Sequence, residues 1–153
     1  MRPKIKVCFH CSATKEGSRF TFEECKRYHT MDKSRGGKGW KDIGYNIYIE
    51  IDGTIHLGRP FGATLAHAKG HNTGFIAICY EGGLDAEGNP KDTRTDDQKQ
   101  AMIACQLFIE HIYDVTEYCG HRDLSPDVNH DGVITPDEWL KACPCFDVKS
   151  EFP

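Results

Sequence analysis

The chain has 153 residues, of which 39% are hydrophobic and 27% are charged, and its formal net charge is −4. These values are typical of one globular domain with a single core. Lys and Arg form no cluster, so the composition does not predict a nucleic-acid partner. The longest apolar run, at residues 75–80, is far shorter than the ~20 residues that cross a bilayer, so we expect no membrane insertion.

The N-terminus carries charge, but no apolar segment of the kind found in secretory signals follows it. We therefore expect a protein that is cytoplasmic as synthesised. The chain contains eight cysteines, which could form a disulfide framework or remain thiols, some of them metal ligands. A domain of this size does not need disulfides to fold, and the expected compartment favours thiols.

The first half of the chain predicts a strand followed by a helix. Residues Lys4–Cys11 alternate between apolar and polar, which is typical of a strand with one packed face, and His10 lies on the other face. Thr21-Phe22-Glu23-Glu24 fits a capping box and predicts a helix to about Thr30. Lys33–Lys38 contains two glycines and predicts a flexible connection.

A hairpin and a buried strand follow. Tyr45–Ile51 and Thr54–Leu57 flank Asp52-Gly53, which is a strong signal for a two-residue hairpin turn. Gly74–Tyr80 is a continuous apolar run of strand length and predicts a buried central strand. We expect Glu81–Thr93 to be a loop.

The last regular elements are a helix and a strand. Thr95-Asp96-Asp97-Gln98 is a second capping box, and Val115–Cys119 predicts a short strand that ends at Gly120-His121. The residues expected to dock the helix on a sheet are Met102, Cys105, Phe108, Ile109 and Ile112. The element order predicts an α/β fold over residues 1–153: a single domain with a mixed central sheet and helices packed on it.

Three side chains suggest a metal site. His10 ends the first predicted strand, His121 follows the last one, and Cys143 stands in Lys141-Ala142-Cys143-Pro144. Two imidazoles and one thiolate suit zinc, and three protein ligands leave a fourth position for water, as in catalytic sites. A structural zinc site around Cys8-x-x-Cys11 is the alternative, but no second Cys pair matches it.

Six segments follow one another from Phe9 to about Asp147, nearly the whole chain. They are Phe9–Lys15 (FHCSATK), Gly39–Tyr45 (GWKDIGY), Asp52–Ile55 (DGTI), Ala66–Asn72 (AHAKGHN), Gly120–Asp123 (GHRD) and Lys141–Pro144 (KACP). Together they resemble the motifs of the zinc-dependent N-acetylmuramoyl-L-alanine amidases, a family that includes phage endolysins and peptidoglycan-recognition proteins.

The resemblance implies an enzyme that hydrolyses the amide bond between N-acetylmuramic acid and L-alanine in peptidoglycan. It implies zinc held by His10, His121 and Cys143, with Tyr45 and Lys141 as catalytic residues. Zinc would polarise the scissile carbonyl, and the Tyr hydroxyl and Lys ammonium could donate to the oxyanion.

The resemblance also bears on residues around the site. His67 is expected at the cleft, where it could bind substrate. Asn46, where relatives often carry His, is expected to alter substrate contacts. His29 matches a position taken to be structural.

A catalytically silent peptidoglycan-binding module is the competing hypothesis. The presence of Cys143, Tyr45 and Lys141 favours the enzyme. The partner is then peptidoglycan or a muropeptide, and we expect a monomer that acts on the cell wall after release from the cell.

The connection from His121 to Cys143 is longer than expected for this family, and residues 127–138 in it fit the EF-hand pattern D-x-[DN]-x-[DN]-G-x5-E. The expected calcium ligands of this EF-hand-like insertion are Asp127, Asn129, Asp131, Val133 (through its carbonyl), Thr135 and Glu138. The alternative is a surface loop without metal, because Pro126 precedes the segment and little helix can follow it.

Overall fold

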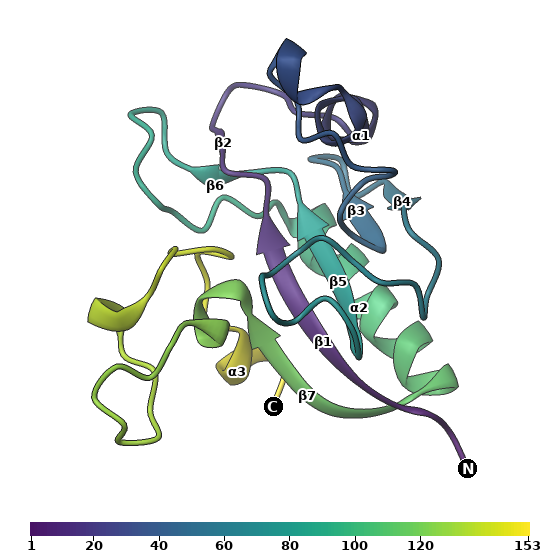
Figure 1. Cartoon of the computed structure of the whole chain (residues 1–153), viewed down its shortest axis with the longest axis vertical. Coiled ribbons are helices and arrows are strands. Elements are labelled where there is room, and N and C mark those ends of the chain that lie inside the picture. Colours follow the sequence, from purple (N-terminus) through teal and green to yellow (C-terminus); the bar gives the residue numbers. More distant parts are fainter.

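The computed structural model describes the whole chain, residues 1–153, and contains one five-stranded and one two-stranded sheet (Figure 1). The strands are β1 (Lys4–Cys11), β2 (Thr14–Lys15), β3 (Ile47–Ile49), β4 (Ile55–Leu57), β5 (Phe75–Tyr80), β6 (Gly83–Leu84) and β7 (Asp114–Gly120). The helices are α1 (Phe22–Thr30), α2 (Asp96–Ile112) and α3 (Val148–Glu151), with 3₁₀ turns η1 (Lys33–Arg35), η2 (His121–Leu124) and η3 (Pro136–Glu138). The predicted α/β class with a mixed sheet is confirmed.

The large sheet has the strand order β4-β3-β5-β1-β7, and only the β3–β4 pair is antiparallel. Strand β5 is central and buried along its whole length, as predicted. Strands β1 and β7 are parallel neighbours with Phe9 opposite Gly120. Their carboxyl ends therefore meet at one edge of the sheet, with His10 next to the last residue of β1 and His121 directly after β7.

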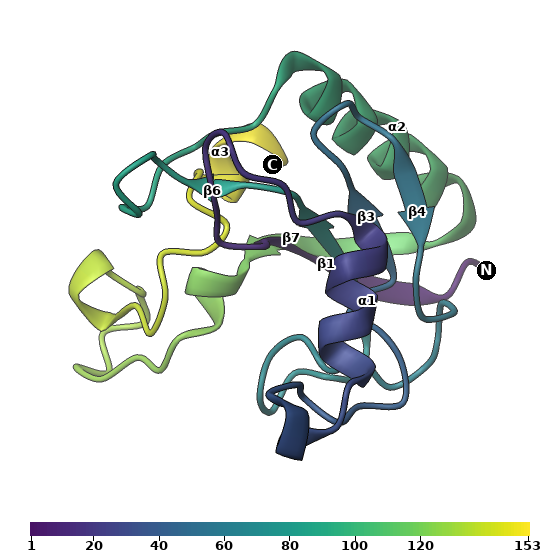
Figure 2. The same ribbon diagram turned by 90° about the horizontal axis from the view of Figure 1, so that it is seen from above.

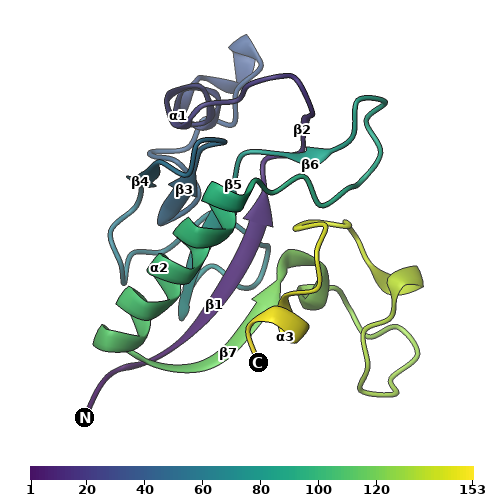
Figure 3. The ribbon, with the colours of Figure 1, turned by 180° about the vertical axis from the view of Figure 1, so that it is seen from behind.

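Helices cover both faces of the sheet. Helices α2 and α3 lie on one face and α1 lies on the other (Figure 2), and α2 runs along the strands when the molecule is seen from behind (Figure 3). Both predicted capping boxes are present, with Thr21 paired to Glu24 and Thr95 paired to Gln98. These caps satisfy backbone N–H groups at the helix starts, which is why local sequence located them correctly.

The docking face of α2 differs in part from the prediction. Met102, Cys105 and Ile109 are buried against the sheet, but Phe108 is 54% exposed and Ile112 is 37% exposed. Phe108 stands on the flank of the helix, and Ile112 is its last residue. The expectation that both dock on the sheet is wrong, because the buried stripe is narrower than the apolar set.

Three further details correct the expectations. The second half of β1 is buried on both faces, because β5 and β7 flank it and helices cover the sheet. The hairpin turn has three residues, 51–53, since the Glu50 N–H donates to the Thr54 carbonyl at 3.0 Å and Gly53 adopts a φ of +84°. Short strand β6 lies within the expected loop at 81–93 and pairs with β2.

The segment between η2 and α3 lies outside the sheet and projects from the body of the domain (Figures 1 and 2). It contains only η3, so residues 127–138 have no helix pair around them. No helix in the molecule is both long and apolar enough to cross a membrane. All eight cysteines are free thiols in this structure.

Candidate active site

His10, His121 and Cys143 converge at the carboxyl ends of β1 and β7. One ligand atom from each residue lies within 4.8 Å of those of the other two. The Nδ1 of His10 is 3.8 Å from the Sγ of Cys143, and the rings of His10 and His121 have centroids 4.7 Å apart. The structure therefore brings together the three residues expected to hold zinc.

Three hydrogen bonds hold the segment around Cys143 beside the sheet. The Cys11 N–H donates to the Cys143 Sγ at 3.2 Å, and the Arg122 N–H donates to the Cys143 carbonyl at 2.7 Å. The Tyr80 hydroxyl donates to the carbonyl of Pro144 at 2.7 Å. These three bonds join the thiol segment to β1, η2 and β5, so its position depends on elements far apart in sequence.

The electrostatics of the site favour neutral imidazoles. Burial, then His121, His67 and Lys141, hold the pKa of His10 well below its usual value. Burial, then Lys141, lowers the pKa of His121 to about 4. Neutral imidazole is the form that binds a metal ion, so both residues are ready to act as ligands near neutral pH.

A second group of possible ligands overlaps the first. One ligand atom each from Cys8, His10 and His67 also lies within 4.8 Å of the others. However, the Nε2 of His10 and the Nδ1 of His67 are hydrogen-bonded at 2.8 Å, which leaves no room for an ion between them. The set with Cys143 is therefore the better candidate for a metal site.

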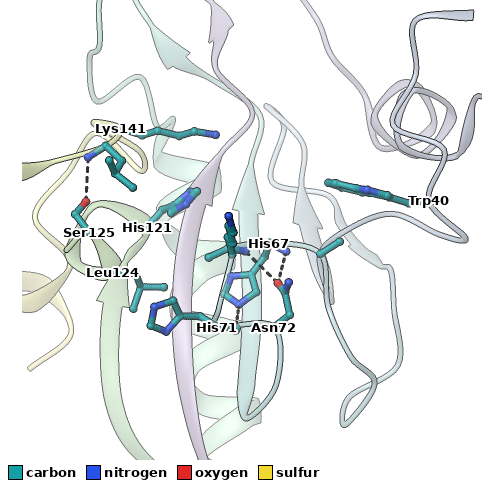
Figure 4. A pocket seen from close by; sticks show the side chains of 12 residues that line it. Trp40, His67, His71, Asn72, His121, Leu124, Ser125 and Lys141 are labelled. Carbon is teal, nitrogen blue, oxygen red and sulfur yellow. Dashed lines mark hydrogen bonds between the residues drawn. The ribbon is translucent and has the colours of Figure 1, made fainter. Parts of the chain in front are cut away.

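The three residues border an open cleft made of two adjoining cavities of about 460 and 270 Å³. The smaller cavity holds His10, Tyr45 and Cys143, and the larger one extends toward Leu124 and Leu140. Both are lined by Trp40, Ala66, His67, His121 and Lys141. Figure 4 shows Lys141 and Trp40 on opposite sides of the larger cavity, with His67 between them.

The two expected catalytic residues both line the smaller cavity. The Tyr45 ring lies 5.2 Å from that of His10, centroid to centroid, and burial raises the pKa of its hydroxyl well above the usual value. Tyr45 is therefore a protonated hydrogen-bond donor. Lys141 is exposed, and its charge acts on the pKa of His10 and of His121.

His67 lies at the cleft, as expected, but neither of its ring nitrogens is free. Its Nδ1 pairs with His10, and its Nε2 lies 2.6 Å from the backbone carbonyl of His71. Burial lowers the pKa of His67 to about 4. Both polar atoms of this imidazole already have partners within the protein, and substrate binding by His67 stays a prediction.

Asn46 does not line either cavity. Its side chain is buried, the Nδ2 donates to the carbonyls of Arg59 and Pro60, and the Oδ1 accepts from the Ala77 N–H at 2.9 Å. The amide is a structural bridge between β5 and the chain after β4, and an effect of Asn46 on substrate contacts stays a prediction.

The carboxylates of the expected calcium-binding segment form hydrogen bonds with backbone N–H groups of the same segment. Asp127 accepts from the N–H of Gly132 at 2.8 Å, and Asp131 accepts from that of Val133 at 2.8 Å. Glu138 accepts from Val128, Asn129 and Thr135. The carboxylates thus accept hydrogen bonds from backbone N–H groups. They are not among the groups of side chains whose ligand atoms lie close enough together to hold a metal ion.

Sequence reasoning missed part of the cleft wall. Trp40, Leu124, Ser125 and Leu140 line the larger cavity, and the Ser125 hydroxyl accepts from the Leu140 N–H at 3.1 Å. Trp40 belongs to a segment already singled out, so its position could have been suspected. The others lie in the long connection, where no periodic pattern marks them.

Comparisons with known proteins agree with this geometry. The sequence pattern of the N-acetylmuramoyl-L-alanine amidase family matches residues 2–144. The endolysin of Klebsiella phage KP32 is 33% identical over 144 residues, which cover 94% of this chain and 82% of the relative. The endolysin of Escherichia phage T7 is 31% identical over 143 residues, with the same shares covered.

The fold also has solved neighbours. The Drosophila peptidoglycan-recognition protein PGRP-LB superposes with a TM-score of 0.67 at 21% identity, covering 99% of this chain and 80% of that one. At that identity the likeness shows the fold. The match over residues 2–144 and the endolysin relatives show more: the chain is an enzyme of the N-acetylmuramoyl-L-alanine amidase family.

Proposed function

We propose that the protein is a zinc-dependent amidase that hydrolyses the bond between N-acetylmuramic acid and L-alanine in peptidoglycan. The observation that carries the proposal is the convergence of His10, His121 and Cys143 on the wall of a cleft that also exposes Lys141. The endolysin relatives, whose name denotes lysis of cell walls, support peptidoglycan as the substrate class.

The donor set fits zinc. Two neutral imidazoles and one thiol come from three separate segments and approach within 4.8 Å, which suits a small tetrahedral ion with an open fourth position. When bound, zinc supplies Lewis-acid chemistry, polarising a carbonyl and making water acidic enough to act as a nucleophile near neutral pH. The smaller cavity lies beside these three residues, so an ion held by them would be accessible to substrate.

The remaining residues act on the charge that develops at the carbonyl oxygen. The Tyr45 hydroxyl keeps its proton at neutral pH and can donate a hydrogen bond to the oxyanion. The Lys141 ammonium, on the same cavity, adds a second donor and a positive charge. The two groups come from separate segments of the chain and line the same cavity.

The site faces an open cleft rather than an enclosed pocket, which suits a polymeric substrate. We propose that the enzyme works as a monomer and acts on the cell wall. Binding of calcium by residues 127–138 stays a prediction. In this structure their carboxylates accept hydrogen bonds from backbone N–H groups, which a calcium ion would have to replace.

The test combines metal analysis with product analysis. Purified protein should contain about one zinc per chain and should release L-alanine amino termini from isolated peptidoglycan. Cys143→Ser should lose both properties, whereas Cys145→Ser, two residues away and outside the ligand set, should keep them. Peptidoglycan binding without new amino termini would favour the silent module, and full cleavage by zinc-free protein would overturn zinc dependence.

A further inference from the structure

The ring of His67 stands in a chain of hydrogen bonds that ends on the candidate metal ligand His10. The Nε2 of His67 lies 2.6 Å from the His71 carbonyl, and its Nδ1 lies 2.8 Å from the Nε2 of His10. His10 and His67 are 1% and 7% exposed, so water does not compete for these bonds. The ring planes meet at 82°, with the edge of one ring toward the other.

The direction of these bonds follows from chemistry. A backbone carbonyl only accepts, so the Nε2 of His67 must carry the proton that joins it to His71. In the neutral ring the Nδ1 of His67 is then an acceptor, and the Nε2 of His10 must donate to it. The proton of His10 is thereby placed on Nε2, and its Nδ1 is left with a free lone pair. That Nδ1 is the atom 3.8 Å from the Cys143 sulfur.

The loop that carries His67 is built to keep the carbonyl in place. The Oδ1 of Asn72 accepts from the N–H groups of His67 and Ala68 at 2.9 and 3.1 Å. The His71 N–H donates to the Ala68 carbonyl at 2.9 Å, and the Leu65 N–H donates to the Asn72 carbonyl at 2.8 Å. The carbonyl acceptor is therefore fixed by the loop, and Figure 4 shows His67, His71 and Asn72 gathered there.

We propose that His67 is a positioning residue that holds His10 in the tautomer protonated at Nε2, so that His10 binds zinc through Nδ1. The proposal rests on the zinc site proposed above, and it assigns His67 a role other than substrate binding. A partner that accepts from the far N–H of a metal-binding His fixes its tautomer and orientation. Losing such a partner lowers metal affinity roughly 10–100-fold.

The first experiment reads the tautomer directly in zinc-free protein labelled with ¹⁵N at histidine. Protonated and unprotonated ring nitrogens have well-separated chemical shifts, and the signals of His10 are assigned by their loss in His10→Asn. We expect His10 protonated at Nε2 and unprotonated at Nδ1. A His10 protonated at Nδ1 overturns the proposal without any substitution at His67.

The second experiment measures zinc affinity by competition with a chelator. His67→Leu should lose affinity roughly 10–100-fold and should show His10 as a mixture of tautomers. His67→Asn should recover most of the affinity, because its Oδ1 stands close to the place of the imidazole Nδ1 and can accept from His10. His71→Ala is the matched control: it keeps the backbone carbonyl and should leave zinc affinity and tautomer unchanged.

The outcomes separate this inference from the proposed function. If the wild-type protein binds no zinc, the proposed function fails, and the zinc-free spectra still judge the tautomer. If zinc binds and His67→Leu binds it as tightly as the wild type, the positioning role is overturned while the zinc site stands. Should His67→Leu not fold, the tautomer of wild-type His10 and the affinity of His67→Asn decide the question.

Discussion

The backbone N–H of Arg122 donates a 2.7 Å hydrogen bond to the carbonyl of Cys143, so the chain after β7 is tied to the segment that carries the thiol. The two segments also pack closely. A Cβ on Gly120 would lie 2.5 Å from the Cδ of Pro144, which means that the close approach depends on a glycine at position 120. One short contact region therefore positions both His121 and Cys143.

Gly120→Ala should disturb this contact. The φ of Gly120 is −93°, which alanine adopts without strain, so the effect is steric. We expect a loss of roughly 1–3 kcal/mol in the free energy of unfolding, as for other overpacked sites, together with weaker zinc binding. Chemical denaturation and chelator competition measure the two effects. Unchanged stability and affinity would show that the Pro144 segment can move aside at no cost.

Tyr45→Phe and Lys141→Ala should each keep zinc and lower turnover, roughly 10²–10³-fold if each group supplies one oxyanion contact. Product release from peptidoglycan and metal analysis of the same preparations check this. Lys69→Ala is the control, because Lys69 lines only the larger cavity and its loss should change turnover much less. An undiminished rate in either of the first two variants removes that residue from the mechanism.

The stability of the fold should depend on pH through His29. Its Nδ1 accepts from the Gly44 N–H at 3.0 Å, and burial, with Lys38 and Arg59, lowers its pKa to about 4. The unfolded state, with a pKa near ~6.5, binds more protons than the native state between these two values. The stabilisation from neutral His29 is therefore complete above pH ~6.5 and is lost as pH falls toward ~4.

His29→Asn isolates this contribution. The amide oxygen of Asn can accept from Gly44 in place of Nδ1, but it does not titrate in this range. We expect the wild type to lose about 2–3 kcal/mol more than the variant between pH 7 and pH 4, in zinc-free protein measured by denaturation. Parallel stability curves for the two proteins would rule out His29 as the source.

Calcium should stabilise the zinc-loaded protein if residues 127–138 bind it. Asp127, Asp131, Asp137 and Glu138 lie close in sequence, and a cation would offset their repulsion. A ligand that binds only the native state adds about 2.7 kcal/mol at a hundredfold excess over its Kd, which raises the melting temperature. The double variant Asp127→Ala, Glu138→Ala should abolish that rise, and magnesium should replace calcium poorly.

Calorimetric titration with calcium alone tests whether residues 127–138 bind the ion at all. No heat of binding at millimolar calcium would show that the segment is a solvated loop closed by its own backbone hydrogen bonds. The proposed amidase activity would stand in that case, because the candidate zinc ligands and the cleft residues Tyr45 and Lys141 lie outside residues 127–138.

The elements of this fold could be predicted from sequence because their signals are local. Capping boxes at Thr21 and Thr95 satisfy helix N–H groups within three residues, and the apolar run before Tyr80 is long enough for one buried strand. The candidate ligand set of His10, His121 and Cys143 could be predicted for a related reason: each residue follows or ends a recognisable element or lies in a recognisable motif.

Tertiary structure alone decided what those residues contact. Asn46 and His67 both stand in or next to segments of the motif series, yet Asn46 bridges backbone segments, whereas His67 donates to a carbonyl and accepts from His10. Their partners come from residues that only the folded chain brings within hydrogen-bonding distance. Sequence spacing carries no information on such distances, so the partners of these two side chains depend on the packed arrangement of β1, β5 and the loop at 65–72.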